Sequence, residues 1–132
     1  MAMRSLSNIT YELDIIPNTK PRMTRADKWK KRPCVIQYRK FKDDLKVECN
    51  NKGLVNLKPQ LESLIFFIPM PKSWSLKKRK EMDKKPHQQS PDLDNLLKGF
   101  WDALLEEDNF IYSIKGELGK YWAEEGKIIL IQ

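Results

Sequence analysis

The segment from Ser90 to Asn109, SPDLDNLLKGFWDALLEEDN, constrains the fold of this chain more than any other. Pro91 favours an extended chain before the residues that follow it. Apolar residues then recur at helical spacing over Leu96–Leu104, and Asp94, a residue type common at helix N-termini, stands just before them. The pattern predicts a helix from Asn95 to about Glu106, capped by Asp94, whose apolar face must be buried against another layer.

Acidic side chains stand at both ends of this predicted helix. Asp92 and Asp94 lie two residues apart before it, and in an extended chain such residues point to the same side. Glu107 and Asp108 follow its end. Carboxylates grouped in this way suit Mg²⁺, which takes oxygen ligands from one or two carboxylates, from water and from a substrate phosphate.

Lys98 lies on the polar face of the predicted helix. Asp94, Lys98 and Asp102 recur every four residues, opposite the apolar face. Each residue also has a plain structural interpretation: Asp94 caps the helix, Lys98 pairs with the two aspartates, and Asp108 opens a turn. A metal site is therefore indicated by the set of residues and not by any one of them.

The segment resembles the signature of the RusA family of Holliday-junction resolvases, small dimeric Mg²⁺-dependent endonucleases of phages and prophages. The resemblance rests on DLDNLLK at residues 92–98, DAL at residues 102–104 and the acidic pair after them. Residues 20–24, 66–74 and 85–87 also look like phage members of that family.

The resemblance implies a role for each matching residue. Asp92, Asp94 and Asp108 match the catalytic, metal-binding aspartates, and Lys98 matches the catalytic lysine. Glu107 stands where an aspartate is common and is a further candidate ligand. The implied cofactor is Mg²⁺, with Mn²⁺ expected to substitute, and the implied assembly is a homodimer.

Charge is divided unevenly along the 132 residues, whose net charge is +7. Residues 1–91 carry 21 Lys or Arg and 9 Asp or Glu, whereas residues 92–132 carry 4 and 9. A basic body can gather phosphates around an acidic end that holds a metal ion. Nucleic acid is therefore the expected partner, and a basic protein without a partner is the alternative.

Two basic segments are predicted to bind DNA phosphates, contacts that carry little sequence information. One is a loop around Trp29, and the other includes a predicted short helix from Ser73 to Met82. A solvated loop and a solvated surface turn are the alternatives. His87, the only histidine, is predicted to lie on the polar surface of the next loop. The predicted DNA-binding residues are Lys20, Arg22, Arg25, Lys28, Lys30, Lys31, Arg32, Lys77, Lys78, Arg79, Lys80, Lys84 and Lys85.

The remaining periodicity predicts one α/β domain over residues 1–132, α+β-like and similar to RusA, with helices packed against a small mixed sheet. Its predicted element order is β-α-β-α-α-β-β. A helix from Pro33 to about Asn50 should bury Cys34, Tyr38, Phe41, Leu45 and Cys49, and Gly53 should end it. The predicted strands are Ile9–Ile15, a central strand Leu61–Ile68, a strand over 110–122 interrupted at Gly116, and Lys127–Ile131 after a hairpin turn at Glu124–Gly126.

The rest of the composition excludes several classes of protein. No apolar run approaches the ~20 residues of a membrane span, the N-terminus lacks a signal-peptide core, and Cys34 and Cys49 follow no metal or disulfide pattern. A cytoplasmic protein of a bacterial host cell, of phage or prophage origin, is expected.

The favoured function is a Mg²⁺-dependent endonuclease that resolves four-way DNA junctions by paired nicks in recombination, repair or phage DNA processing. The alternatives are a DNA-binding protein that does not cut and a Mg²⁺ nuclease for other branched DNA. The first alternative is disfavoured because binding an anion gains nothing from clustered carboxylates.

The length of the predicted helix limits which carboxylates of one chain can bind the same metal ion. Twelve helical residues span ~18 Å, whereas the oxygen ligands of one Mg²⁺ lie within ~2.1 Å of it. Either the helix is shorter or bent, or Asp108 joins Asp92 and Asp94 of a second copy. A two-fold dimer with antiparallel helices would form two such composite sites.

Overall fold

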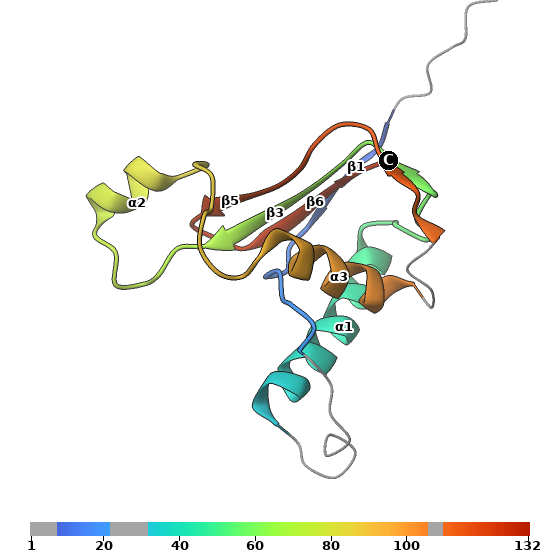
Figure 1. The fold of residues 1–132 in the computed structure, drawn as a ribbon, viewed down its shortest axis with the longest axis horizontal. Coiled ribbons are helices and arrows are strands. Elements are labelled where there is room, and N and C mark those ends of the chain that lie inside the picture. The colour runs from blue at the N-terminus through green and yellow to red at the C-terminus, as the bar shows by residue number, and fades with distance from the viewer. Residues whose placement is uncertain (1–7, 22–31, 106–109) are drawn as a thin grey trace, which may run out of the picture.

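The computed structural model describes residues 8–21, 32–105 and 110–132 (Figure 1). Its elements are β1 (Thr10–Leu13), α1 (Pro33–Asn51), β2 (Gln60–Leu61), β3 (Ser63–Pro69), α2 (Leu76–Met82), α3 (Leu93–Leu104), β4 (Ser113–Ile114), β5 (Leu118–Ala123) and β6 (Lys127–Ile131). This is an α+β fold with a mixed sheet, as predicted. No helix in the described ranges is long and apolar enough to cross a membrane.

The main sheet has the strand order β1-β6-β3-β5. β6 runs antiparallel to both β1 and β3, and β5 runs parallel to β3. β3 therefore has a partner on each side, which confirms the predicted central strand.

The predicted bounds of the strands Leu61–Ile68 and 110–122 are wrong. In each of them the chain passes from a small second sheet into the main sheet. Gln60–Leu61 pairs in parallel with Ser113–Ile114 in a separate two-stranded sheet. Between the small sheet and the main sheet, the two segments meet at Gly116, whose N–H donates to the Glu62 carbonyl at 2.6 Å. A Cβ at position 116 would lie 2.6 Å from that same oxygen, so a glycine is required where the two backbones meet.

The predicted hairpin at Glu124–Gly126 is also wrong. β5 and β6 pair with opposite edges of β3, so residues 124–126 cross the end of β3 and do not join adjacent strands. Among the described glycines, positive φ occurs at Gly53 and not at Gly126. A Cβ at position 126 would lie 2.9 Å from Cγ1 of Ile16, so this glycine permits close packing against Ile16.

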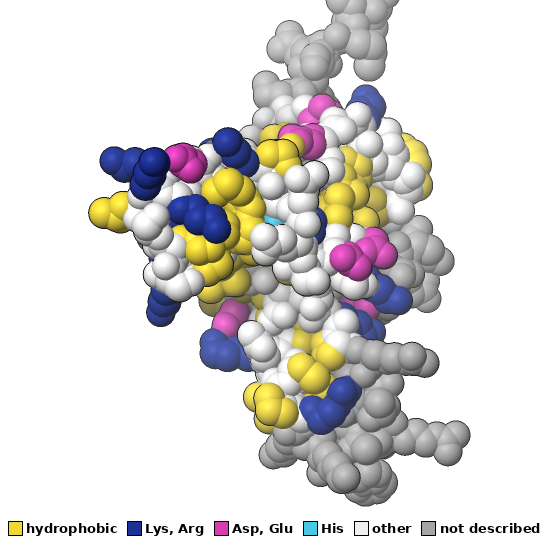
Figure 2. All heavy atoms as spheres, turned by 60° about the vertical axis from the view of Figure 1, so that its left-hand side comes forward, with side chains coloured by type: hydrophobic (Ala, Val, Ile, Leu, Met, Phe, Trp, Pro, Cys, Tyr) yellow, Lys and Arg dark blue, Asp and Glu magenta, His cyan; other side chains and the backbone are white. Residues whose placement is uncertain are grey.

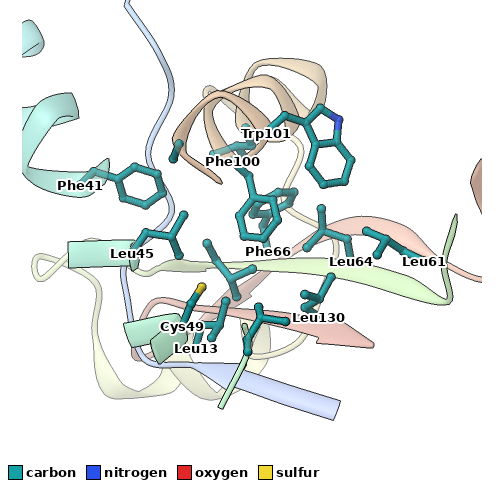
Figure 3. Close-up of a cluster of buried hydrophobic side chains, with 14 of the residues drawn as sticks. Leu13, Phe41, Leu45, Cys49, Leu61, Leu64, Phe66, Phe100, Trp101 and Leu130 are labelled. Atoms are coloured by element: carbon teal, nitrogen blue, oxygen red, sulfur yellow. The ribbon is translucent and has the colours of Figure 1, made fainter. Parts of the chain in front are cut away.

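α1 and α3 cover one face of the main sheet and enclose the core (Figure 1). The predicted stripe of α1 is confirmed except at its start, where Val35 is buried and Cys34 is exposed. Val35 takes this place because it lies three residues before Tyr38 on the buried face. Figure 3 shows the side chains that meet between the helices and the sheet, among them Phe41, Leu45, Leu64, Phe66, Phe100, Trp101 and Leu130.

α3 begins two residues earlier than predicted. Its N-cap is Asp92, Asp94 lies in the first turn, and the helix ends at Leu104 instead of Glu106. Asp is favourable at either position, so the packing of apolar side chains decides at which residue the helix begins. With the earlier start, Leu93 becomes helical and packs against the core.

His87 is buried, contrary to the prediction of a polar surface position. Its side chain is 3% exposed, and its ring centroid lies 4.2 Å from that of Trp122, which in turn lies 4.7 Å from that of Trp74. Nδ1 of His87 has no hydrogen-bond partner within the described part of the chain. Burial, together with the positive charge of Lys120, lowers the pKa of His87 below its ordinary value of 6.5.

Gly99→Ala should destabilise the protein although alanine favours helix by about 1 kcal/mol. The segment Asn18–Lys20 crosses α3 at this position, and a Cβ would lie 2.7 Å from the Asn18 carbonyl oxygen and 3.2 Å from the Lys20 nitrogen. Because both contacts are with backbone, we expect a loss of about 1–3 kcal/mol in the free energy of unfolding. Urea unfolding measures it, and a variant as stable as the wild type would contradict the close crossing.

His87 should make the stability depend on pH below about 6.5. Since folding lowers its pKa, the unfolded chain takes up a proton first as the pH falls, and the folded state loses stability. His87→Phe keeps an aromatic ring without a titrating group. Urea unfolding between pH 8 and pH 5 should show a smaller loss for His87→Phe than for the wild type, and parallel curves would show that His87 does not contribute.

Candidate active site

Asp92 and Asp94 are exposed at the start of α3. Asp92 has φ −69° and ψ 148°, the extended backbone of an N-cap, but its side chain makes no capping hydrogen bond. Asp94 is already helical, so the expectation that both residues share an extended segment is wrong. Neither carboxylate has an ion-pair or hydrogen-bond partner among the described residues. With respect to the described chain, both carboxylates are therefore available to a ligand, at the end of α3 where the helix dipole favours negative charge.

Lys98 lies one helical turn after Asp94 and is also exposed. It forms no ion pair with Asp94, with Asp102 or with any other residue in the described ranges. The structural interpretation, in which Lys98 only neutralises the two aspartates, therefore finds no support. No described residue occupies the ammonium of Lys98, which is thus available to an anion one turn from Asp94.

Asp102 has a different partner. Oδ2 of Asp102 lies 3.0 Å from Nζ of Lys20, and this contact compensates an oxygen that is shielded from solvent and otherwise unbonded in the described structure. Nearby, the Tyr38 hydroxyl donates to the Gly99 carbonyl at 2.9 Å. Burial raises the pKa of Tyr38 to about 12, with a further contribution from the charge of Asp102. Lys20, a predicted DNA-binding residue, thus ties the segment before residue 22 to α3.

Lys120 is a residue at this site that the sequence analysis missed. Its Nζ donates to the carbonyl oxygens of Gln89 at 2.6 Å and of Pro91 at 2.5 Å, just before Asp92. A signal was present in the sequence, because Lys120 interrupts the alternation of apolar residues that includes Leu118 and Trp122. The lysine thus contacts the chain that leads into α3.

α2 carries predicted DNA-binding cations away from the core, and none of its residues is buried. Figure 2 shows Lys and Arg side chains around an apolar surface on this face. Arg79 donates to the carbonyls of Trp74 at 3.2 Å and Pro71 at 3.0 Å, and Nζ of Lys78 lies 4.3 Å from the Trp74 ring centroid. Two of the predicted cations therefore also hold α2 in place.

The remaining described cations differ in their contacts. Lys77, Lys80 and Lys85 are exposed. Nζ of Lys84 lies 5.0 Å from the Phe67 ring centroid and 3.6 Å from Oδ1 of Asp83. Arg32 directly precedes α1. Lys77, Lys80 and Lys85 thus leave α2 and the chain after it with positive charge that no described residue pairs.

Several predicted site residues lie outside the described residues. They are the acidic pair Glu107 and Asp108 and, around Trp29, the cations Arg22, Arg25, Lys28, Lys30 and Lys31. The described residues contain no group of three or more His, Cys, Asp or Glu side chains that could hold one metal ion. The donor chemistry of Asp92 and Asp94, which have no partner among the described residues, nevertheless fits Mg²⁺, which commonly uses one or two carboxylates and completes its shell with water and phosphate.

Comparison with known proteins bears on the identity of the site. A family model described as Endodeoxyribonuclease RusA matches residues 12–131, from β1 to β6. Neither the curated proteins nor the solved structures contain a match to the chain. The family match covers nearly the whole chain and includes the helix that carries Asp92, Asp94 and Lys98. The chain therefore belongs to the RusA family of endodeoxyribonucleases.

Proposed function

We propose that this protein is a Mg²⁺-dependent endonuclease that resolves four-way DNA junctions by paired nicks. The observation that carries the proposal is the start of α3, where Asp92 and Asp94 are exposed, with Lys98 one turn further along, and none of the three is paired with another described residue. A stripe that served only solubility would gain from pairing Lys98 with its acidic neighbours. Membership of an endodeoxyribonuclease family supports hydrolysis of a DNA phosphodiester.

Asp92, Asp94 and Asp108 would hold the metal ion, with Glu107 as a further candidate and Mn²⁺ as a substitute. When bound, Mg²⁺ supplies a water of lowered pKa and positive charge beside the attacked phosphate. The two described carboxylates have no competing partner in the described chain, so they are available as ligands. Lys98 would place its ammonium where charge develops on the phosphate or on the leaving oxygen, as preorganised positive charge does.

The basic surface would hold the arms of the junction. Lys77, Lys80 and Lys85 present exposed ammonium groups on and after α2, which is joined to β5 through the contact of Trp74 with Trp122. Contacts with phosphates fix orientation and carry little information about sequence. Such a surface suits a nuclease that recognises the shape of a branched substrate.

A homodimer would supply the two cuts. α3 has 12 residues and so separates its two ends by ~18 Å, which favours Asp108 from a second copy as the partner of Asp92 and Asp94. Antiparallel α3 helices across a two-fold axis would form two composite sites. Two symmetric nicks are what the resolution of a four-way junction requires.

Asp92→Asn and Asp94→Asn should each reduce Mg²⁺-dependent nicking by more than about 100-fold, since even residues that only orient metal ligands contribute 10–100-fold. Binding of the junction should persist or tighten, because a negative charge near phosphate is removed. Labelled four-way junction, Y-fork and plain duplex are incubated with Mg²⁺ or EDTA, and binding is measured in EDTA. Asp43→Asn, at an exposed position of α1, is the matched control.

The substrates separate the outcomes of this experiment. Cutting of the junction in preference to the fork supports the proposal, and equal cutting of both would indicate a nuclease for branched DNA in general. Binding without any Mg²⁺-dependent cutting by the wild type would identify a DNA-binding protein. Near-wild-type nicking by both aspartate variants would reject the assignment of the site.

Mixing inactive Asp92→Asn with inactive Asp108→Asn should restore nicking of one strand. An exchanged heterodimer carries one site in which all three aspartates are intact and one site in which two are replaced. Subunit exchange is verified with differently tagged chains, and strand-specific labels record the cut. Failure to recover nicking after demonstrated exchange would mean that each site is built from a single chain.

A further inference from the structure

Strand β5 carries a lysine on the face of the sheet that borders the core. In the parallel register Lys120 lies beside Phe66 of β3, which is buried in the core, and Trp122 lies beside Ile68. Side chains paired in this way point to the same face of a sheet. Lys120 therefore stands on the face covered by α3, between the apolar Leu118 and Trp122. A lysine in such a row loses hydration, and its ammonium needs hydrogen-bond acceptors in compensation.

The acceptors are main-chain carbonyls of the segment before α3. The ammonium donates to the Gln89 oxygen at 2.6 Å and to the Pro91 oxygen at 2.5 Å. Within the described structure, residues 88–91 make no other hydrogen bond. Lys120 is thus the only described hydrogen-bonding group that holds this segment to the sheet.

The chain on either side of this segment is fixed independently. Before it, the backbone pairs with β5, since Trp122 N–H donates to the Lys85 oxygen at 2.9 Å and His87 N–H donates to the Lys120 oxygen at 3.1 Å. After it, Leu96 and Phe100 anchor α3 in the core. The segment between these two anchors ends directly at Asp92. Its conformation therefore sets the direction from which Asp92 enters the helix.

We propose that Lys120 is a positioning residue of the active site, which fixes the backbone before Asp92 and so arranges Asp92 and Asp94 for a divalent cation. The inference rests on the proposed function in that it assigns these carboxylates to the metal. Lys120 acts through the main chain and need not touch DNA or metal. Without its two hydrogen bonds the segment gains freedom, and the two carboxylates spend less time in the arrangement that a cation requires.

Metal binding without DNA provides the test. Lys120→Met removes the ammonium and keeps an unbranched side chain, and Lys120→Arg keeps a charged donor. Lys115→Met is the matched control, because Lys115 is exposed and its side chain has no partner among the described residues. Binding of Mn²⁺ to the full-length chain is followed by the electron paramagnetic resonance signal of the free ion. Urea unfolding and junction binding in EDTA are measured on the same proteins.

Lys120→Met should bind Mn²⁺ about 10–100-fold more weakly than the wild type, the range found when groups that orient metal ligands are removed. Lys120→Arg should recover part of the loss, and Lys115→Met should match the wild type. Junction affinity in EDTA should stay within a few-fold of the wild type. In nicking assays the Mg²⁺ concentration for half-maximal rate should rise in the same order as the Mn²⁺ dissociation constant.

Other results would overturn the proposal. Mn²⁺ binding by Lys120→Met equal to that by Lys115→Met would show that Lys120 does not arrange the ligands. A loss confined to junction affinity would make it a DNA contact, and a wild type that binds no Mn²⁺ would leave nothing to position. If Lys120→Met does not fold, Lys120→Gln, which keeps an uncharged NH₂ donor on a shorter side chain, decides the question by the same Mn²⁺ measurement. A wild type that binds Mn²⁺ but does not nick junctions would reject the proposed function and leave the role of Lys120 to be judged on metal binding.

Discussion

The burial of one face of α3 is the constraint on which the rest of this structure depends. Leu96, Phe100 and Ala103 pack into the core between α1 and the main sheet, and removing such side chains from water is the dominant favourable contribution to folding. Because a helix has a fixed rotation per residue, this burial also directs Asp94 and Lys98 outward. The packing that stabilises the domain thus presents the polar stripe to solvent.

Glycines and aromatic residues bring distant segments to this helix. Gly99 lets the segment Asn18–Lys20 pass close enough for Lys20 to reach Asp102. Before α3 in the chain, Trp74 and His87 pack with tilted rings against Trp122 of β5. β5, an edge strand of the main sheet, therefore contacts both the segment that leads into α2 and the segment that leads into the carboxylates of α3. A change in β5 can affect both the basic surface and the acidic site.

The charges of the chain are separated in space as well as in sequence. α2 and the residues after it display several ammonium groups, whereas the start of α3 displays two exposed carboxylates. Positive charge attracts DNA over a distance of about a Debye length, while carboxylates near phosphate are repulsive until a cation lies between them. Under the proposed function, this arrangement would let the acidic group stand near DNA without weakening its binding once a metal ion is bound.

The sequence by itself determined the family, the helix with its stripe of Asp94 and Lys98, the stripe of α1 and the central strand, because these follow from local spacing that one layer of packing enforces. Only the tertiary structure decided where α3 begins, since Asp92 and Asp94 cap a helix equally well and the burial of Leu93 makes the choice. It also decided that β3 lies between β5 and β6, that His87 is buried under Trp122, and that Lys120 reaches Gln89 and Pro91. These features join residues far apart in the chain, and no local pattern specifies which strands become neighbours or which backbone carbonyls a partly buried lysine contacts.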